Sequence, residues 1–237
     1  MKRLLVYPQP SSGESVSSYL STLAEKNGFR KIGSMMKCHF KDSSVTQDDI
    51  TKSDLVRLTG HTVDIVDQVG LTKSDNHFQP HYYYYNLAIP SYHLRSYQLV
   101  CSSCIKEKAS LDARWRIAWL PYCLRHQALL VRPDVQDDHF PTTNGLMASN
   151  DDVYNDRLLT VQKAIEEKLD YESRILVSLP HQDSVVTLID YHLKKAIGDG
   201  RFNSYSNRRR KYSKRFFPLN QQDTLKFLDC LYTQKAA

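Results

Sequence analysis

Apolar residues recur at helical spacing in several separate stretches of the chain, which predicts a mainly α-helical protein. In the stretch "SVSSYLSTLAEKNGF", four apolar residues share one side of a helix, as a period of about 3.6 residues requires. Ser12 or Ser15 is placed to cap the start of this helix, and Gly28 is placed to end it. The four apolar positions are Tyr19, Leu20, Leu23 and Ala24.

The stretch "TQDDITKSDLVRLTGHTVDIVDQVG" predicts two short helices around a turn at Gly60. The first starts near Thr46 or Gln47, and the second ends at Gly70. This pair has the outline of a helix-turn-helix, in which the second helix reads the major groove of DNA. That helix holds two acids and no Lys or Arg, so a scaffold or protein-binding role is favoured over groove reading. The apolar positions are Ile50, Leu55 and Leu58 in the first helix and Val63, Ile65, Val66 and Val69 in the second.

A segment rich in tyrosine and histidine follows, "NHFQPHYYYYNLAIPSYHLRSYQ". Pro80 and Pro90 bound it, so a long regular helix is not expected. Its four consecutive tyrosines fit either an extended segment that packs on the rest of the protein or a platform on which bases stack. Packing is the simpler interpretation.

The C-terminal part of the chain predicts more helices, after the polar loop "RPDVQDDHFPTTNGLMASNDD". The helical stretches are "DVYNDRLLTVQKAIEEKLD", "SVVTLIDYHLKKAIGDG" and "PLNQQDTLKFLDCLYTQ", and Cys230 in the last is expected to be a small buried residue. We therefore expect three regions: a helix-turn-helix-like region at 1–75, a metal-binding module at 76–135 and a helical region with a basic segment at 136–237.

The charge of the chain is concentrated at its C-terminal end. Residues 201–237 hold nine Lys or Arg and two Asp or Glu, whereas the first 200 residues hold 23 basic and 24 acidic residues. Such a localised basic segment predicts contact with the phosphates of DNA or RNA. The alternative is a solvated basic tail without a partner. The candidate nucleic-acid-binding residues are Arg208, Arg209, Arg210, Lys211, Lys214 and Arg215.

The chain has no apolar run of about 18 residues, so no membrane span is expected. Its first residues contain an apolar run too short for a signal peptide, which predicts a cytoplasmic protein. In that compartment disulfides are rare, and clustered cysteines more often bind metals. The odd count of five cysteines agrees with this interpretation.

Two short pairs of metal-ligand residues stand out, Cys101-x-x-Cys104 and Cys123-x-x-His126, with eighteen residues between them. A spacing of two residues allows one turn to aim both side chains at a single ion, and two such pairs give the four tetrahedral ligands of structural zinc. The segment between the pairs suits a zinc ribbon or a knuckle of treble-clef type. The alternative, unrelated thiols beside a catalytic Cys–His pair, leaves the first pair unexplained.

A site with four protein ligands has no open position for a catalytic water, which argues against a zinc hydrolase or nuclease. The chain also shows no glycine-rich phosphate loop, no His-Glu-x-x-His and no serine nucleophile elbow. We therefore expect a protein that is not an enzyme.

With these motifs in hand, the chain resembles the TniQ/TnsD family of transposition target-selection proteins over about residues 5–131. The opening "YPQPSSGESVSSYLSTLAEKNGF" is similar to the proline-containing start of that family and its first helix. The central "CSSCIKEKASLDARWRIAWLPYCLRHQALL" is similar to its zinc module, and "LVRLTGHTVDIV" lies between the two as expected. The resemblance implies zinc at Cys101, Cys104, Cys123 and His126, with Trp115 and Trp119 as the core of the module.

The resemblance further implies a non-catalytic adaptor for target selection in DNA transposition. Its expected partners are a TnsC-like AAA+ ATPase that regulates the transposase, an RNA-guided effector of the Cascade type with its guide RNA, target DNA, and a second copy of the chain. The chain lacks the second Cys-x-x-Cys pair of some members and has only about a hundred residues after the zinc module, which favours the short form found in CRISPR-associated transposons. The alternative function is a zinc-ribbon, helix-turn-helix regulator of transcription.

Overall fold

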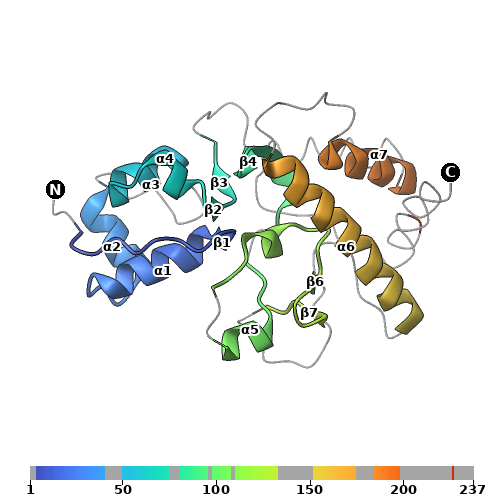
Figure 1. The fold of residues 1–237 in the computed structure, drawn as a ribbon, viewed down its shortest axis with the longest axis horizontal. Coiled ribbons are helices and arrows are strands. Elements are labelled where there is room, and N and C mark those ends of the chain that lie inside the picture. The colour runs from blue at the N-terminus through green and yellow to red at the C-terminus, as the bar shows by residue number, and fades with distance from the viewer. Residues whose placement is uncertain are drawn as a thin grey trace. The chain divides into compact units, whose positions relative to one another are not determined.

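The computed structural model divides the chain into two compact units (Figure 1). Unit 1 comprises Met1–Ala88 and Lys108–Arg114, and unit 2 comprises Ile89–Glu107 and Trp115–Ala237. Among the described residues, no helix combines the length and apolar character needed to cross a bilayer. The described residues are 4–40, 50–74, 81–95, 98–107, 110–132, 152–174, 184–197 and 226.

The first helix of unit 1, α1 (Val16–Lys26), confirms the predicted helix and one of its two predicted caps. The Ser15 side chain accepts a hydrogen bond from the Ser18 N–H, which satisfies one of the free amides at the helix start. The chain leaves the helix through Gly28, whose φ of +76° is readily adopted by glycine. The four predicted apolar positions, Tyr19, Leu20, Leu23 and Ala24, are all buried.

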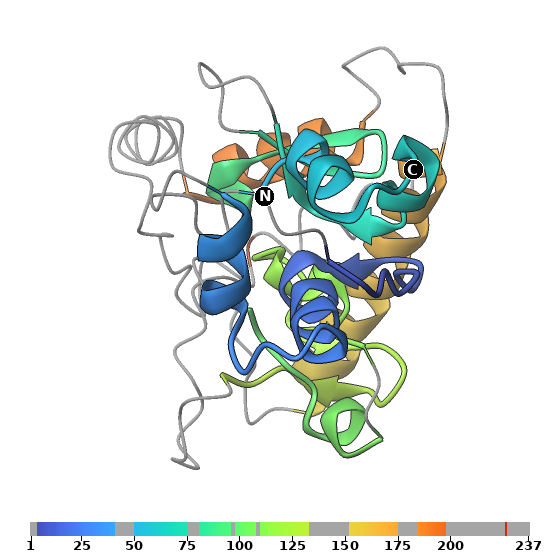
Figure 2. The ribbon, with the colours of Figure 1, turned by 90° about the vertical axis from the view of Figure 1, so that its left-hand side faces the viewer.

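Helix α2 (Ile32–His39) buries Met35 and Met36 in the same core as α1 (blue in Figure 2). Helix α3 (Lys52–Thr59) begins later than the expected start near Thr46 or Gln47, a stretch that is outside the described residues. Its N-cap is Thr51, which forms a reciprocal capping box with Asp54. Thr51 caps this helix because Asp54 follows it by three residues, the spacing that a capping box requires.

Helix α4 (Val63–Val66) is only four residues long, so the prediction of a helix reaching Gly70 was wrong. Val69 and Gly70 instead form strand β2 (Val69–Gly70), which pairs in parallel with β1 (Glu14–Ser15). The strand is possible because Gly70 lacks a side chain: a Cβ there would lie 2.6 Å from the Ala113 Cβ. Tertiary pairing therefore overrides the local helical pattern.

The inserted segment Lys108–Arg114 completes unit 1 by pairing beside β1. The Ser15 N–H donates to the Leu111 carbonyl at 2.7 Å, and the Ala113 N–H donates to the Gly13 carbonyl at 2.9 Å. The first strand of the molecule is thus flanked by segments from two distant parts of the sequence.

The tyrosine run forms β4 (His81–Tyr84), which pairs antiparallel with β3 (Thr72–Lys73), as the prediction of an extended segment requires. After β4 the chain turns at Tyr85, whose φ is +52°, into β5 (Leu87–Pro90). The boundary between the two units falls within β5.

Unit 2 begins with the 3₁₀ turn η1 (Ser91–His93) and continues through the short helix α5 (Ser102–Lys106) to β6 (Tyr122–Cys123) and β7 (Ala128–Leu129), an antiparallel hairpin. Between them, the turn η2 (Ala113–Arg116) starts in unit 1 and leads back into unit 2. Trp115 and Trp119 are buried, which confirms them as core residues.

A buried guanidinium organises the backbone before β6. Arg95 is fully buried and donates to the carbonyl oxygens of Trp115 and Ala118 at 3.1 and 3.0 Å, and also to the Ile117 carbonyl. The planar, multiply donating guanidinium suits several convergent carbonyls better than an ammonium would. These hydrogen bonds hold in place the loop that leads from η2 to the second pair of candidate metal ligands.

Unit 2 also contains two longer helices, α6 (Asp152–Arg174) and α7 (Val185–Ile197). The Gln162 side chain of α6 accepts from the Tyr122 N–H at 2.9 Å and donates to the Tyr122 carbonyl at 2.6 Å, so α6 is anchored to β6. The buried Glu172 carboxylate accepts the Val185 N–H and so caps the start of α7. The predicted apolar positions of α6, namely Leu158, Val161, Ile165 and Leu169, are buried.

Candidate metal centre

Two short structural elements place the four candidate ligands. Cys101 is the N-cap of α5 and Cys104 lies within that helix, while Cys123 ends β6 and His126 lies in the turn before β7. All four ligand atoms lie within 4.8 Å of one another. The structure therefore brings together all four residues that the sequence singled out as metal ligands.

Four of the six distances between the ligand atoms are close to those of a tetrahedral site. Ligand atoms about 2.0–2.3 Å from one ion at tetrahedral angles lie roughly 3.5–3.8 Å from one another. The Cys104 and Cys123 sulfurs are 3.8 Å apart. The Nδ1 atom of His126 lies 3.5, 3.3 and 3.7 Å from the sulfurs of Cys101, Cys104 and Cys123. The same four atoms all lie within 4.8 Å of one another, so a single ion could be shared by all four side chains.

The three thiols share a space in which they cannot all ionise without a cation. Burial, followed by the neighbouring Cys123 and Cys101 sulfurs, raises the pKa of the Cys104 thiol to about 12. Burial also raises the pKa of Cys123. Burial acts in the same direction on Cys101, but hydrogen bonds led by that from the Cys104 backbone outweigh it and lower its pKa. A divalent cation would supply the positive charge that three thiolates require.

Backbone amides support the sulfurs at both pairs. Hydrogen bonds from the Cys104 and Ser103 backbone favour the thiolate of Cys101, and one from the His126 backbone favours that of Cys123. The turn that contains Ser103 therefore supplies backbone amides to the first pair. The same arrangement in the second pair makes the two halves of the site alike.

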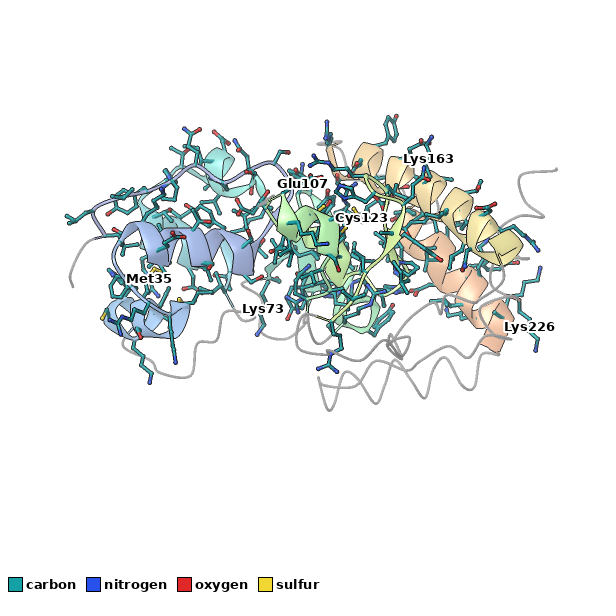
Figure 3. The ribbon with its side chains drawn as sticks, turned by 90° about the horizontal axis from the view of Figure 1, so that it is seen from below. Met35, Lys73, Glu107, Cys123, Lys163 and Lys226 are labelled. Atoms are coloured by element: carbon teal, nitrogen blue, oxygen red, sulfur yellow. The ribbon has the colours of Figure 1, made fainter. Side chains whose placement is uncertain are left out.

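Sequence analysis missed Glu107, which orients the histidine. Its carboxylate lies 2.9 Å from His126 Nε2 and 2.8 Å from the exposed Arg125 guanidinium. The hydrogen bond from Glu107 is the largest cause of a raised pKa at His126. Because Nδ1 faces the sulfurs, this carboxylate holds the proton on Nε2 and leaves Nδ1 free as a ligand. Figure 3 labels Glu107 and Cys123 in this region.

Glu107 gave only a weak signal in the sequence. It follows Cys104 by three residues, at the end of the same short helix, and such an acid is ordinary on a protein surface. Only the fold, which brings the turn of His126 against this helix end, gives the carboxylate its partner.

The donor set of three sulfurs and one imidazole nitrogen fits a structural metal of the zinc type. All four positions of a tetrahedron are filled by side chains, and the three cysteines are buried. The residues of the predicted nucleic-acid site, Arg208–Arg215, are outside the described residues, as is Cys230. Lys226 of the last predicted helix is described as helical and exposed.

Comparison with models of known protein families gives a match. The model of the TniQ family matches residues 5–130, which is 126 of the 237 residues of the chain. The match runs from the segment before α1 to the end of the hairpin after His126, so it contains all four candidate ligands. No curated protein matches the chain.

Proposed function

The chain belongs to the TniQ family, which is associated with the machinery of DNA transposition, and from that premise we propose that it is a non-catalytic adaptor for target selection. In this role it links target DNA or an RNA-guided, Cascade-like effector to a TnsC-like AAA+ ATPase and so to the transposase. The family match over more than half of the chain is the observation that carries the proposal.

We propose zinc as the resident metal, with Cys101, Cys104, Cys123 and His126 as its ligands. The ion supplies structural cross-linking between α5 and the β6–β7 hairpin. The chain's own residues prepare the site: backbone amides stabilise the sulfurs and Glu107 orients the imidazole.

The filled ligand set supports a role without catalysis. A zinc hydrolase needs a coordination position for water or substrate, and the four side chains here occupy every vertex of the tetrahedron. An adaptor needs the metal only to hold a binding surface in shape.

A transcription regulator that reads an operator is the less favoured function. Its reading helix would correspond to α4, which is a single turn of four residues and contains Asp64. Asp67, which follows directly, is paired with Lys52 at 2.6 Å. A one-turn acidic helix is poorly suited to enter a groove lined by phosphates.

A capture experiment with metal analysis tests the adaptor. The tagged protein is expressed with the transposition genes that neighbour its own, purified under mild conditions, and analysed for bound proteins and for zinc. We expect an AAA+ ATPase in the eluate and one zinc per chain. Recovery of one specific DNA fragment without any AAA+ ATPase would refute the adaptor and support the regulator.

A further inference from the structure

Helix α7 has a buried apolar face and an exposed face of polar and basic residues. Val185, Val186, Ile189, Leu193 and Ala196 of this helix are buried. The opposite side carries four exposed residues at positions i, i+4, i+7 and i+8, which form one continuous stripe. We call this stripe the α7 face; it consists of Thr187, Tyr191, Lys194 and Lys195.

The α7 face carries no acid, because the only carboxylate of the helix is turned inward. Asp190 accepts the Tyr92 hydroxyl at 2.8 Å and lies 2.8 Å from His93 Nε2. Both partners belong to η1, so these contacts also attach α7 to the start of unit 2. Lys194, one turn further, adds to the charge that favours ionised Asp190. The only carboxylate of α7 therefore lies away from the exposed surface that carries Lys194 and Lys195.

Tyr191 is an exposed aromatic residue. Its exposed fraction is 55%, and its ring meets the buried His192 ring edge-on at 5.1 Å. The Tyr191 ring therefore contacts the buried His192 ring, while much of its surface remains exposed to solvent. Tyrosine and threonine hydroxyls, like lysine ammonium groups, are common donors to DNA phosphates.

We propose that the α7 face binds the phosphate backbone of duplex DNA, which names a DNA-contacting surface for the adaptor and rests on that proposed function. From Thr187 to Lys195 the helix rises about 12 Å. A DNA strand advances about 3.4 Å per phosphate, so the stripe spans roughly three successive phosphates. Contacts of this kind position a protein on DNA without reading its sequence.

The sequence after α7 continues the same charge. The helix ends at Ile197, and the chain proceeds through Arg201 towards the basic cluster that begins at Arg208. The excess of basic residues in the sequence therefore extends beyond the end of α7. This continuity favours nucleic acid over an acidic patch of protein as the occupant.

Salt-dependent binding to a DNA duplex of arbitrary sequence tests the proposal on the full-length, metal-loaded protein. The variant Lys194→Gln/Lys195→Gln loses two phosphate contacts, so the slope of log K against log salt becomes less negative by about 1.8. The loss is the same for unrelated duplex sequences. An unchanged slope, or no binding of duplex by the wild-type protein, overturns the proposal.

A matched control removes two exposed lysines elsewhere. Lys37 lies on α2 and Lys163 on α6, and the variant Lys37→Gln/Lys163→Gln changes the net charge equally. We expect its slope to equal that of the wild type. An equal loss of slope in both variants would assign binding to net charge rather than to the α7 face.

The variant Tyr191→Phe tests the contribution of the tyrosine hydroxyl separately from that of the two lysine charges. The ring and its contact with His192 remain, so affinity falls by a few-fold while the salt slope is unchanged. Wild-type affinity in this variant overturns the role of the hydroxyl.

The failure of this proposal is distinguishable from failure of the adaptor. An AAA+ ATPase captured by a protein that binds no duplex leaves the adaptor intact and refutes the α7 face. Loss of a captured protein in Lys194→Gln/Lys195→Gln, with DNA binding unchanged, assigns the face to a protein partner and likewise refutes the proposal.

Discussion

At the scale of single residues, Cys104 depends most strongly on a metal. Its thiol is buried, its pKa is raised to about 12, and its sulfur lies within 3.8 Å of both Cys123 Sγ and His126 Nδ1. A raised pKa means that its surroundings favour the neutral thiol over the thiolate unless a cation is near. Its contribution to folding is therefore linked to the cation that converts it to thiolate.

Cys104→Ser should prevent stable metal binding and lower the thermal stability of the protein. A serine hydroxyl is a poor zinc ligand, and three remaining ligands leave a buried site incomplete. Thermal melting with and without a chelator measures this: the wild type should lose stability on chelation, and the variant should not respond. A variant as stable as the metal-loaded wild type would contradict the structural role.

Glu107→Gln should weaken metal binding by roughly 10- to 100-fold, as is common when a carboxylate behind a histidine ligand is lost. The amide removes the negative charge that holds the proton on His126 Nε2. Competition with a chromogenic chelator gives the affinity. Glu167→Gln, at an exposed position of α6, should leave the affinity unchanged.

Asp190 is expected to make the free energy of unfolding decrease at acidic pH. Burial raises its pKa, but the hydrogen bond and charge of His93 and the Tyr92 hydroxyl outweigh burial and lower it below the ordinary value. A carboxyl with a lowered folded-state pKa stabilises the protein above its unfolded-state pKa of about 3.9, and this contribution is lost as pH falls through the folded value.

Asp190→Asn should therefore cost about 1.5–3 kcal/mol at neutral pH, the range for hydrogen bonds to a charged group. The difference from the wild type should shrink as the pH falls below about 4. Denaturant unfolding at a series of pH values measures it. A difference that stays constant down to pH 2 would contradict the role of the ionised carboxylate.

At the scale of elements, the sequence predicts what local spacing determines. The helices α1, α6 and α7 were predictable because their apolar residues repeat with the helical period over eleven residues or more. The cluster of four candidate metal ligands was predictable because each pair lies within one turn.

Features that depend on distant partners were not predictable. Val69 continues a helical pattern yet lies in a strand, because its partner Glu14 is far away in sequence. Glu107 has no recognisable signal in the sequence because its partner His126 comes from another turn. In each case tertiary pairing decides between locally acceptable alternatives.

The cap of α3 provides a test at this scale. Thr51→Ala removes the side-chain oxygen that accepts the Asp54 N–H, whereas the hydrogen bond from the backbone N–H of residue 51 to the Asp54 carboxylate can remain, and the change should cost about 1 kcal/mol of unfolding free energy. Thr62→Ala is the matched control, because Thr62 is the N-cap of α4 but makes no cap hydrogen bond through its side chain. Equal losses in the two variants, measured by denaturant unfolding, would contradict the capping assignment.

At the scale of the whole molecule, charge separates the C-terminal segment from the rest. The net charge of the chain is +6, and residues 201–237 carry nine basic and two acidic residues. Residues 1–200 are nearly neutral and residues 201–237 are basic, so electrostatic attraction to nucleic acid is expected mainly through residues 201–237.

Replacing Arg208, Arg209 and Arg210 by glutamine should weaken nucleic-acid binding and flatten its salt dependence. Each lost phosphate contact changes the slope by about 0.9 for duplex DNA and about 0.7 for a single strand. Titrations at several salt concentrations with DNA and with RNA measure both the loss and the preferred nucleic acid. An unchanged slope would identify the segment as a solvated tail.

The insertion of Lys108–Arg114 into unit 1 has a consequence for dividing the molecule. This segment lies in the sequence between the two ligand pairs, so a metal that joins Cys104 to Cys123 closes a loop whose middle is paired with Gly13 and Ser15. A fragment ending at Ala88 would leave Gly13 and Ser15 without these backbone partners. Because unit 1 consists of two separate stretches of sequence, a single crossover cannot transfer either unit whole to another protein. A chimeric protein should therefore take the stretch from α1 to His126 from one parent.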